Sequence, residues 1–347
     1  MILLREIQEQ DLDALEKLAQ IPGFINLLND RDFLRDRILR SQASFHDKIV
    51  NKMDGKYIFV AEDLEHKRVL GTSMIAAQHG TTEAPHFYFE VGSEEKFSDM
   101  IGTGFIHGTI KLKYDTNGPS EIGGLVMDPD FRNSEARVGR QISFIRFLFL
   151  GLNKSRFKRK VLAELLPPLN KKGQSPLWEA VGRRFTNMDY WEADQLCQKD
   201  KEFIFSLFPT GKIYTTFLPA EARNSIGKVG KETEPVLHML KKIGFGYRNQ
   251  VDPFDGGPHL WANVEDILPV KKIMQYTFEP GLAAPEGNML DQGLISPAQQ
   301  KLGTFRALAV QAYAKDGKLN VMGDGRDLLK HGLGVLPGDS VVFMPYY

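Results

Sequence analysis

Three arginines and one glycine stand where a strand-like segment passes into an apolar helix. In the stretch GGLVMDPDFRNSEARVGRQISFIRFLFL, residues 123–150, they are Arg132, Arg137, Gly139 and Arg140. The start of a helix exposes backbone N–H groups and carries a partial positive charge, to which the arginines add full charges. This pattern favours binding of a phosphate or pyrophosphate group. The alternative is that the arginines lie in a polar loop and contact only water.

The segments around this motif have the order strand, helix, strand, helix. Strands are predicted over 125–127 and 160–165, and a helix from about Gly139 has apolar residues at the spacing that buries one face. A second helix is expected to begin after Ser175, a good N-cap residue that is followed by proline. This order predicts two parallel strands joined by a crossover helix.

The N-terminal part is predicted to contain a strand, a helix with Asp11 as its N-cap, and a hairpin followed by a further strand. No pattern assigns a structure to residues 93–119, which are rich in glycine, aspartate and threonine. The strands of this part are expected over residues 2–5, 56–63, 69–77 and 86–92.

The rest of the chain is predicted to form a second, weaker α/β half and a small terminal β subdomain. Residues 235–245 have a helical pattern that ends at Gly244, and residues 247–258 contain a strand and a turn. The pair Asp316-Gly317 has the chemistry of a hairpin turn. A segment rich in glycine, proline and alanine before it is predicted to be a linker. The expected division is a first α/β half at 1–195, a second α/β half at 196–278, the linker at 279–300 and the β-rich C-terminal subdomain at 301–347.

The composition argues against several classes of protein. The 347 residues include 44 basic and 44 acidic ones, and a net charge of zero disfavours a general nucleic-acid binder. The single cysteine, Cys197, rules out an internal disulfide. No run of about eighteen uncharged apolar residues is present, so a cytoplasmic protein without a membrane partner is expected. No group of cysteine, histidine or carboxylate residues has metal-ligand spacing in the sequence, so no metal is predicted.

The order of elements and the motif LVMDPDFR, residues 125–132, resemble the acyl-CoA-dependent N-acetyltransferase (GNAT) superfamily. The resemblance implies an α/β fold with a GNAT-like mixed sheet and flanking helices. It also implies that the pantetheine arm of coenzyme A lies where two strands part, with the pyrophosphate on the arginine loop. The superfamily's usual R-x-x-G-x-G/A is stretched here to RNSEARVGR. The residues implied in binding the coenzyme are Leu125, Val126, Arg132, Arg137, Val138, Gly139 and Arg140.

Longer segments resemble the arginine N-succinyltransferase family. The most specific are SPLWEAVGRRFTNMDY (175–190) and GFGYRNQVDPFDGGP (244–258), and similar segments are distributed over nearly the whole chain. The resemblance implies transfer of a succinyl group from succinyl-CoA, or from another acyl-CoA, to the α-amine of arginine in arginine catabolism. It further implies that Leu125 lies against succinyl-CoA and that the protein assembles as a homo-oligomer or with a related subunit.

Two positions depart from that family's pattern. The stretch IGKVG has Gly230 where the family has a histidine regarded as the proton donor, and glycine cannot transfer a proton. The stretch AELLPP has Leu166 and Pro167 where the family has arginine and glycine. Two alternatives therefore stay open. One is an acyltransferase of the same fold with a different acyl donor or amine acceptor, and the other is a catalytically impaired subunit of a succinyltransferase complex.

Acyl transfer to an amine needs a neutral amine, hydrogen-bond donors for the thioester oxyanion and a proton for the departing thiolate. Backbone N–H groups around Leu125 and Val126 could supply the oxyanion donors. Glu121 and Glu164 match acidic positions of the family motifs, so each is a candidate to relay a proton or to bind a cationic acceptor. Each could instead cap a strand or pair with an arginine.

An arginine acceptor would need carboxylates, because a planar guanidinium pairs with them through two parallel hydrogen bonds. Asp252 and Asp255 could serve, although the Gly-Gly-Pro that follows also fits an ordinary turn. His238 is expected to be packed on an apolar helix face rather than to replace the missing proton donor. The other candidate donors are His107, His259, Tyr190 and Tyr247.

Overall fold

The computed structural model describes most of the chain, and its described residues form two compact units. Unit 1 comprises Met1–Ala77, Ser120–Arg159 and Asn263–Tyr347, and unit 2 comprises Gln78–Pro119 and Lys160–Ala262. The predicted first half, residues 1–195, thus contributes to both units. The described residues are 1–21, 30–132, 136–197, 200–283, 290–300, 302–323 and 325–346.

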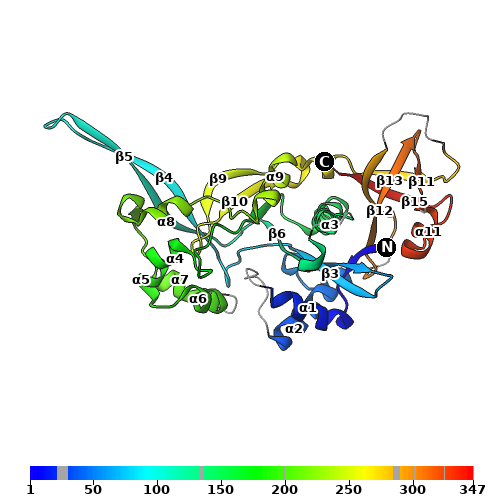
Figure 1. The fold of residues 1–347 in the computed structure, drawn as a ribbon, viewed down its shortest axis with the longest axis horizontal. Helices are drawn as coiled ribbons and strands as arrows, with labels where there is room; N and C mark the ends of the chain where they lie inside the picture. The colour runs from blue at the N-terminus through cyan, green and yellow to red at the C-terminus, as the bar shows by residue number, and fades with distance from the viewer. Residues whose placement is uncertain are drawn as a thin grey trace. The chain divides into compact units, whose positions relative to one another are not determined.

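Unit 1 is a sheet with helices packed against it (Figure 1). Its strands, in their order across the sheet, are β12 (Asp291–Pro297), β15 (Ser340–Pro345), β11 (Met274–Phe278), β14 (Lys318–Val321), β13 (Arg306–Lys315), β1 (Ile2–Glu6), β2 (Lys56–Asp63), β3 (Arg68–Ala76) and β6 (Ser120–Met127). Its helices are α1 (Leu12–Ala19), α2 (Arg31–Phe45), α3 (Val138–Leu152), α10 (Leu268–Lys271) and α11 (Gly325–Leu328).

The alternation of side chains along β2 places helices on the two faces of this part of the sheet. Ile58 and Val60 pack in one apolar cluster with Leu12, Leu15 and Ala19 of α1 and with Leu34 and Ile38 of α2. Phe59, on the other face, meets Phe149 of α3 at a ring-centroid distance of 5.4 Å. Because α3 is buried on nearly all sides between residues 141 and 150, it is a core helix and fixes the arginine loop that precedes it.

The C-terminal strands close into a ring. β12 pairs with both β13 and β15, and β11 and β14 complete the circuit. The predicted turn at Asp316 and Gly317 is confirmed, because it joins β13 to β14 and both residues have positive φ angles, of 50° and 76°. The segment predicted as a linker, 279–300, contains strand β12, which is a correction to the composition-based prediction.

In its described residues, unit 2 combines a second group of strands with six short helices. Its strands, in their order across the sheet, are β7 (Lys160–Glu164), β10 (Pro258–Asn263), β9 (Gly246–Val251), β4 (His86–Ser98), β5 (Thr103–Asp115) and β8 (Lys212–Tyr214). Its helices are α4 (Pro176–Ala180), α5 (Gly182–Thr186), α6 (Tyr190–Cys197), α7 (Glu202–Leu207), α8 (Ala220–Ser225) and α9 (Glu234–Lys242). Ser175 caps α4 as predicted, with its hydroxyl accepting the N–H of Trp178 at 3.0 Å.

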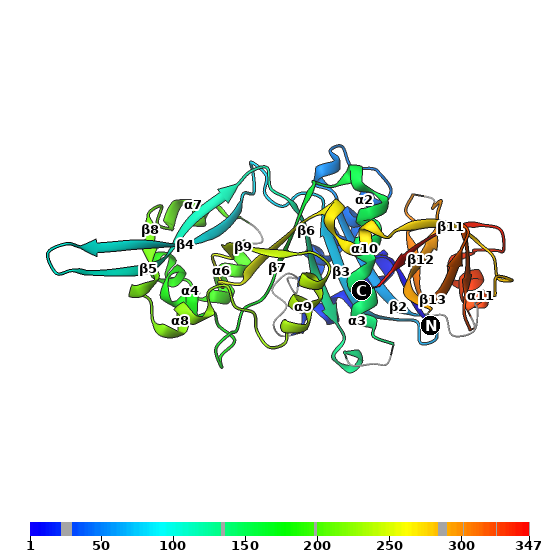
Figure 2. The ribbon, with the colours of Figure 1, turned by 90° about the horizontal axis from the view of Figure 1, so that it is seen from above.

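The residues without a sequence assignment, 93–119, belong to a long hairpin. β4 and β5 pair without interruption from His86 opposite Asp115 to Ser98 opposite Thr103. Figure 2 shows this hairpin extending past the helices of unit 2. Large apolar side chains near its turn are more than half exposed, and they are Phe97, Met100, Ile101, Phe105 and Ile106. No helix in the described part of the chain is both long and apolar enough to cross a membrane.

Candidate active site

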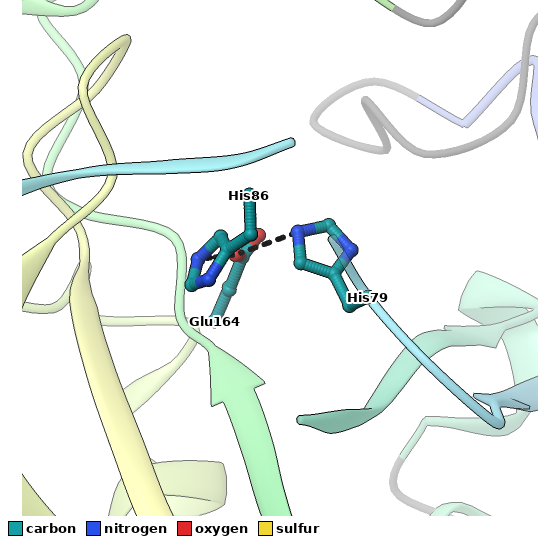
Figure 3. A group of neighbouring side chains, drawn as sticks. All are labelled: His79, His86 and Glu164. Atoms are coloured by element: carbon teal, nitrogen blue, oxygen red, sulfur yellow. Dashed lines mark ion pairs between the residues drawn. The ribbon is translucent and has the colours of Figure 1, made fainter. Parts of the chain in front are cut away.

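A carboxylate with three imidazoles beside it lies in unit 2, at the end of β7. Figure 3 shows the carboxylate, Glu164, with two of these imidazoles, His79 and His86. The Oε1 atom of Glu164 is 3.4 Å from Nε2 of His86, 3.5 Å from Nε2 of His259 and 3.7 Å from Nε2 of His79. His86 and His259 are buried, with side-chain exposures of 1% and 0%. His79 and Glu164 remain 19% and 29% exposed. The cluster is therefore open to solvent only on the side of His79 and Glu164.

Tight backbone contacts hold His79 in place. Its N–H donates to the carbonyl of Pro119 at 2.7 Å, and the N–H of Gly118 donates to the carbonyl of Gly80 at 3.1 Å. A Cβ atom on Gly118 would lie 1.9 Å from the carbonyl oxygen of His79, so only glycine allows this close approach. Gly80 has a φ of 95°, which turns the chain between His79 and the start of β4. The first imidazole is therefore positioned by backbone geometry.

Strand pairing positions the other two imidazoles. His86 is the first residue of β4 and pairs with Asp115 of β5. His259 follows Pro258 in β10, where the pairing with β9 shifts register. The N–H of Leu165 donates to the carbonyl of Pro258 at 3.3 Å, which sets the end of β7 beside β10. These pairings bring the Glu164 and His259 side chains together.

The cluster combines an ionised carboxylate with buried imidazole. Burial acts to raise the pKa of Glu164, but the neighbouring imidazoles, His259 foremost, outweigh it and hold that pKa well below its usual range. Burial lowers the pKa of His86, which keeps its ring neutral near neutral pH. A carboxylate beside neutral imidazole can accept a proton, bind a cation or hold a metal ion.

Asp252 and Asp255 lie in the turn between β9 and β10. The Oδ1 atom of Asp252 accepts the N–H groups of Phe254 at 2.7 Å and Asp255 at 3.0 Å, and Oδ1 of Asp255 accepts the N–H of Gly257 at 2.7 Å. The turn is packed by Phe254, whose ring stacks on Trp178 at 4.9 Å. Each aspartate thus uses one oxygen to fix the turn.

The same two aspartates interact electrostatically with Glu164. Burial raises the pKa of Asp252 to about 7, and the negative charge of Glu164 raises it further. The N–H groups of the turn act in the opposite direction, but their effect is smaller. Burial, followed by the charge of Asp252, raises the pKa of Asp255 well above its usual value. A carboxylate oxygen of Asp252 lies within 4.8 Å of a carboxylate oxygen of Glu164 and of a ring nitrogen of His259. Burial and the neighbouring carboxylates thus favour the protonated forms of both aspartates, and a cationic group bound beside them would stabilise their ionised forms.

Unit 1 contains a backbone irregularity at Leu125. In the pairing of β3 with β6, Thr72 lies opposite Val126 and Met74 opposite Gly123, so Gly124 and Leu125 together oppose one residue of β3. Gly124 has a φ of 55°, and its carbonyl accepts the hydroxyl of Thr72 at 3.1 Å. This is a β-bulge, which releases backbone groups from the regular ladder.

A buried arginine supports the bulge from α3. Arg146, 3% exposed, donates to the carbonyl of Gly123 at 3.3 Å and to the carbonyl and hydroxyl of Ser143 at 3.0 and 2.7 Å. Burial lowers the pKa of Arg146 to about 9. The side chain therefore ties the strand before the bulge to the core helix.

The predicted arginine loop surrounds the N-terminus of α3. Arg137 is the N-cap residue, with a φ of 47°, and Arg132 ends the preceding short turn; both are exposed. Arg140 is half-buried, with its guanidinium 4.5 Å from the ring centroid of Tyr346. Val138 is buried, and a Cβ atom on Gly139 would contact Met127 at 3.6 Å. The structure thus groups these five residues at one helix N-terminus.

The remaining candidates are spread over both units. Glu121 is buried in β6 of unit 1, opposite Ala76. His238 is exposed on α9, which corrects the prediction that it is packed. His107 in β5 lies with Nδ1 3.0 Å from the hydroxyl of Thr216. Of the donor candidates named from the sequence, His259 is the one that contacts Glu164.

The sequence pattern does not indicate His79 and His86 as site residues. They are seven residues apart and come together with Glu164 only because a turn and two separate strands meet. The sequence spacing of His79, His86 and Glu164 matches no short ligand motif, so no local signal could have found the cluster.

The two departures from the family pattern contact each other. The N–H of Gly230 donates to the carbonyl of Leu166 at 3.0 Å, and a Cβ atom on Gly230 would lie 3.0 Å from the carbonyl oxygen of Pro167. Gly230 therefore contacts the segment that directly follows Glu164, and the two departures share one patch of backbone.

Comparisons with known proteins agree with this architecture. A family model described as arginine N-succinyltransferase beta subunit matches residues 2–269. The chain is 32% identical to an arginine N-succinyltransferase of Yersinia pseudotuberculosis over 351 residues, which cover 98% of this chain and 97% of that protein. It is 34% identical to one of Citrobacter koseri over 288 residues, which cover 82% and 83% of the two chains.

A solved structure is similar over almost the full length. It is described as arginine/ornithine succinyltransferase subunit AI from Pseudomonas aeruginosa, with a TM-score of 0.83 at 28% identity, and the match covers 99% of this chain and 98% of that one. The predicted α/β fold class, with a mixed sheet and flanking helices, is confirmed. The chain belongs to the arginine N-succinyltransferase family, a family of acyltransferases.

Proposed function

We propose that the protein transfers a succinyl group from succinyl-CoA to the α-amine of arginine. The observation that carries this proposal is the family match over nearly the whole chain. The β-bulge at Leu125 and the arginine-flanked N-terminus of α3 support it, since an acyl-CoA has a thioester carbonyl that needs donors and a pyrophosphate that needs cations.

The coenzyme is assigned to residues of unit 1. Backbone N–H groups at Leu125 and Val126 donate to the thioester oxygen as negative charge develops on it. Arg132, Arg137 and Arg140 neutralise the pyrophosphate, while N–H groups of the first helical turn, at Val138 and Gly139, donate to its oxygens. Gly139 lets the phosphates approach the backbone because it has no side chain.

The acceptor amine is assigned to acidic residues. The neutral amine attacks the thioester carbon, the carbon–sulfur bond breaks, one amine proton leaves, and the thiolate takes up a proton. Glu164 and Glu121 are the candidates to accept the amine proton. Asp252 and Asp255 keep one carboxylate oxygen each outside the turn hydrogen bonds described above, and these oxygens suit a guanidinium.

Release of free thiol tests this function. Purified protein incubated with succinyl-CoA and arginine is expected to release coenzyme A at a rate that depends on both substrates. The contact between Gly230 and Leu166 favours a second candidate, an acyltransferase with another donor or acceptor, so the panel includes acetyl-CoA, ornithine and lysine. A preferred pair other than succinyl-CoA and arginine would support the second candidate. No release with any pair would leave the impaired-subunit alternative, which predicts turnover only after a related subunit is added.

Reversing the charge of Arg137 is expected to weaken acyl-CoA binding. One charge-assisted contact to a phosphate contributes about 1.5–3 kcal/mol, so Arg137→Glu should raise the KM for the acyl-CoA about 10- to 100-fold. The KM for the amine should stay the same. Arg35→Glu is the matched control, because Arg35 is an exposed arginine of α2 that pairs with Asp32. An equal effect of the two substitutions on the KM for acyl-CoA would contradict the phosphate role.

We also propose that the protein assembles through the tip of the β4–β5 hairpin. The side chains of Phe97, Met100 and Ile106 are 62%, 91% and 75% exposed, which is more apolar surface than a free hairpin tip normally carries. Light scattering should give the molar mass of an oligomer for the wild type and a lower one for Met100→Ser combined with Ile106→Ser. An unchanged mass would exclude this surface.

A further inference from the structure

We propose that His79, His86 and Glu164 form a binding site for a divalent transition-metal ion such as Zn²⁺. One ligand atom from each residue lies within 4.8 Å of the others, and the three side chains point toward one another (Figure 3). The site follows from the geometry of unit 2 alone and does not depend on the proposed acyl transfer.

The distances are those of ligands around an ion rather than those of hydrogen bonds. The Nε2 atoms of His86 and His79 are 3.4 and 3.7 Å from Oε1 of Glu164. Tetrahedral zinc has metal–ligand distances of about 2.0–2.2 Å, which separates neighbouring ligand atoms by about 3.2–3.6 Å. By contrast, His66 Nδ1 and Asp63 Oδ2, which share a hydrogen bond, are 2.7 Å apart. The space between the side chains of His79, His86 and Glu164 therefore fits an ion.

The buried ring of His86 is poorly satisfied by the described residues. Its side chain is 1% exposed, Oε1 of Glu164 approaches Nε2 only to 3.4 Å, and neither ring nitrogen makes a hydrogen bond of normal geometry with the described residues. Buried polar atoms in folded proteins nearly always have one. A metal ion bound through Nε2 would supply it, at the point where that atom already faces the carboxylate.

The ligand set indicates the type of ion and an open coordination position. Two imidazoles and one carboxylate suit zinc and other first-row transition ions better than calcium or magnesium, which prefer oxygen ligands. Three protein ligands leave a fourth position for water or for an exogenous ligand. The partial exposure of His79 and Glu164 provides access to that position. His259 contacts the same oxygen of Glu164 from its buried place in β10 and positions the carboxylate.

This site changes how Glu164 acts when the ion is bound. A carboxylate oxygen that binds a metal cannot also accept the amine proton, so Glu121 would then be the remaining candidate for that step. Sequence spacing gives no sign of this arrangement, because the three side chains come from a loop and two separate strands.

Metal titration of the untagged full-length protein tests the proposal. After dialysis against a chelator, calorimetric titration with Zn²⁺ should show one site per chain, and Co²⁺ should give the visible absorption of a four-coordinate complex. His86→Ala and Glu164→Gln should each weaken Zn²⁺ binding by more than about 100-fold, because loss of a ligand exceeds the effect of losing a residue that only orients one.

The matched control is His66→Ala. His66 also neighbours a carboxylate, but its side chain is 62% exposed and already hydrogen-bonded to Asp63, so the variant should keep the Zn²⁺ affinity of the wild type. Circular dichroism establishes that each variant is folded, and the isosteric Glu164→Gln provides the answer if His86→Ala does not fold. The proposal is overturned if the wild type binds no ion, or if folded Glu164→Gln binds as tightly as the wild type. Loss of metal binding and loss of thiol release are separate readouts, so failure of one leaves the other interpretable.

Discussion

Gly124→Val is expected to lower kcat for acyl transfer by about 100- to 1000-fold, the effect of removing one oxyanion donor. Gly124 has a φ of 55°, a conformation that a β-branched residue adopts only with strain. A Cβ atom there would lie 2.9 Å from Cγ of Met74. Valine should therefore flatten or shift the bulge and turn the N–H groups near Leu125 away from the thioester. Steady-state thiol release measures the effect.

Gly102→Val separates loss of the bulge from the general cost of a left-handed valine. Gly102, in the turn of the β4–β5 hairpin, has a φ of 58°, and a Cβ atom there would have no atom within 4 Å. This control should destabilise its turn and leave kcat unchanged. A folded Gly124→Val protein with kcat within a few-fold of the wild type would show that the bulge provides no oxyanion donors.

Arg5→Met is expected to lower the free energy of unfolding by about 3–5 kcal/mol, the usual cost of leaving buried charges without their partner. The guanidinium of Arg5 donates to both carboxylate oxygens of Asp11, at 2.7 and 2.8 Å, and to Glu62 at 2.6 Å. The side chains of Arg5 and Asp11 are only 9% and 5% exposed. The substitution therefore leaves the carboxylates of Asp11 and Glu62 without their cationic partner beside the core. Urea unfolding followed by circular dichroism measures the loss of unfolding free energy.

A second arginine that bridges two acids serves as the control. Arg31 pairs with Asp13 and Glu16, but its side chain is 47% exposed, so water replaces the lost partner. Arg31→Met should leave the urea midpoint nearly unchanged. Equal destabilisation by Arg31→Met and Arg5→Met would show that burial does not determine the strength of these ion pairs.

Local signals in the sequence predicted most of the elements. The turn at Asp316 and Gly317, the cap at Ser175 and the helix from about Gly139 each depend on a few neighbouring residues, and the structure confirms them. The sequence pattern predicted one buried face for that helix, whereas α3 is buried on nearly all sides. β12 was missed because its neighbours are rich in glycine and proline, and its pairing with β13 and β15 is decided by distant parts of the chain. The hairpin at 93–119 was missed for a related reason, since its exposed strands lack a regular pattern of buried residues.

The residues of the candidate site likewise include some that a local sequence pattern indicates and others that only the fold brings together. The arginine loop is one continuous stretch, so its residues could be named together before the fold was known, and the structure groups them at the start of α3. Glu164 could be named through the family resemblance. His79 and His86 could not, because the contact with Glu164 arises from strand pairing and from the close approach of Gly118 to the backbone of His79.

The most direct test of the central claim uses arginine labelled with a heavy nitrogen isotope at the α-amine. After incubation with succinyl-CoA and the protein, nuclear magnetic resonance should show the labelled nitrogen converted from an amine to an amide, in step with the release of coenzyme A. A labelled nitrogen that remains an amine while thiol release proceeds would place the acyl group elsewhere and contradict the assignment of arginine's α-amine as the acceptor.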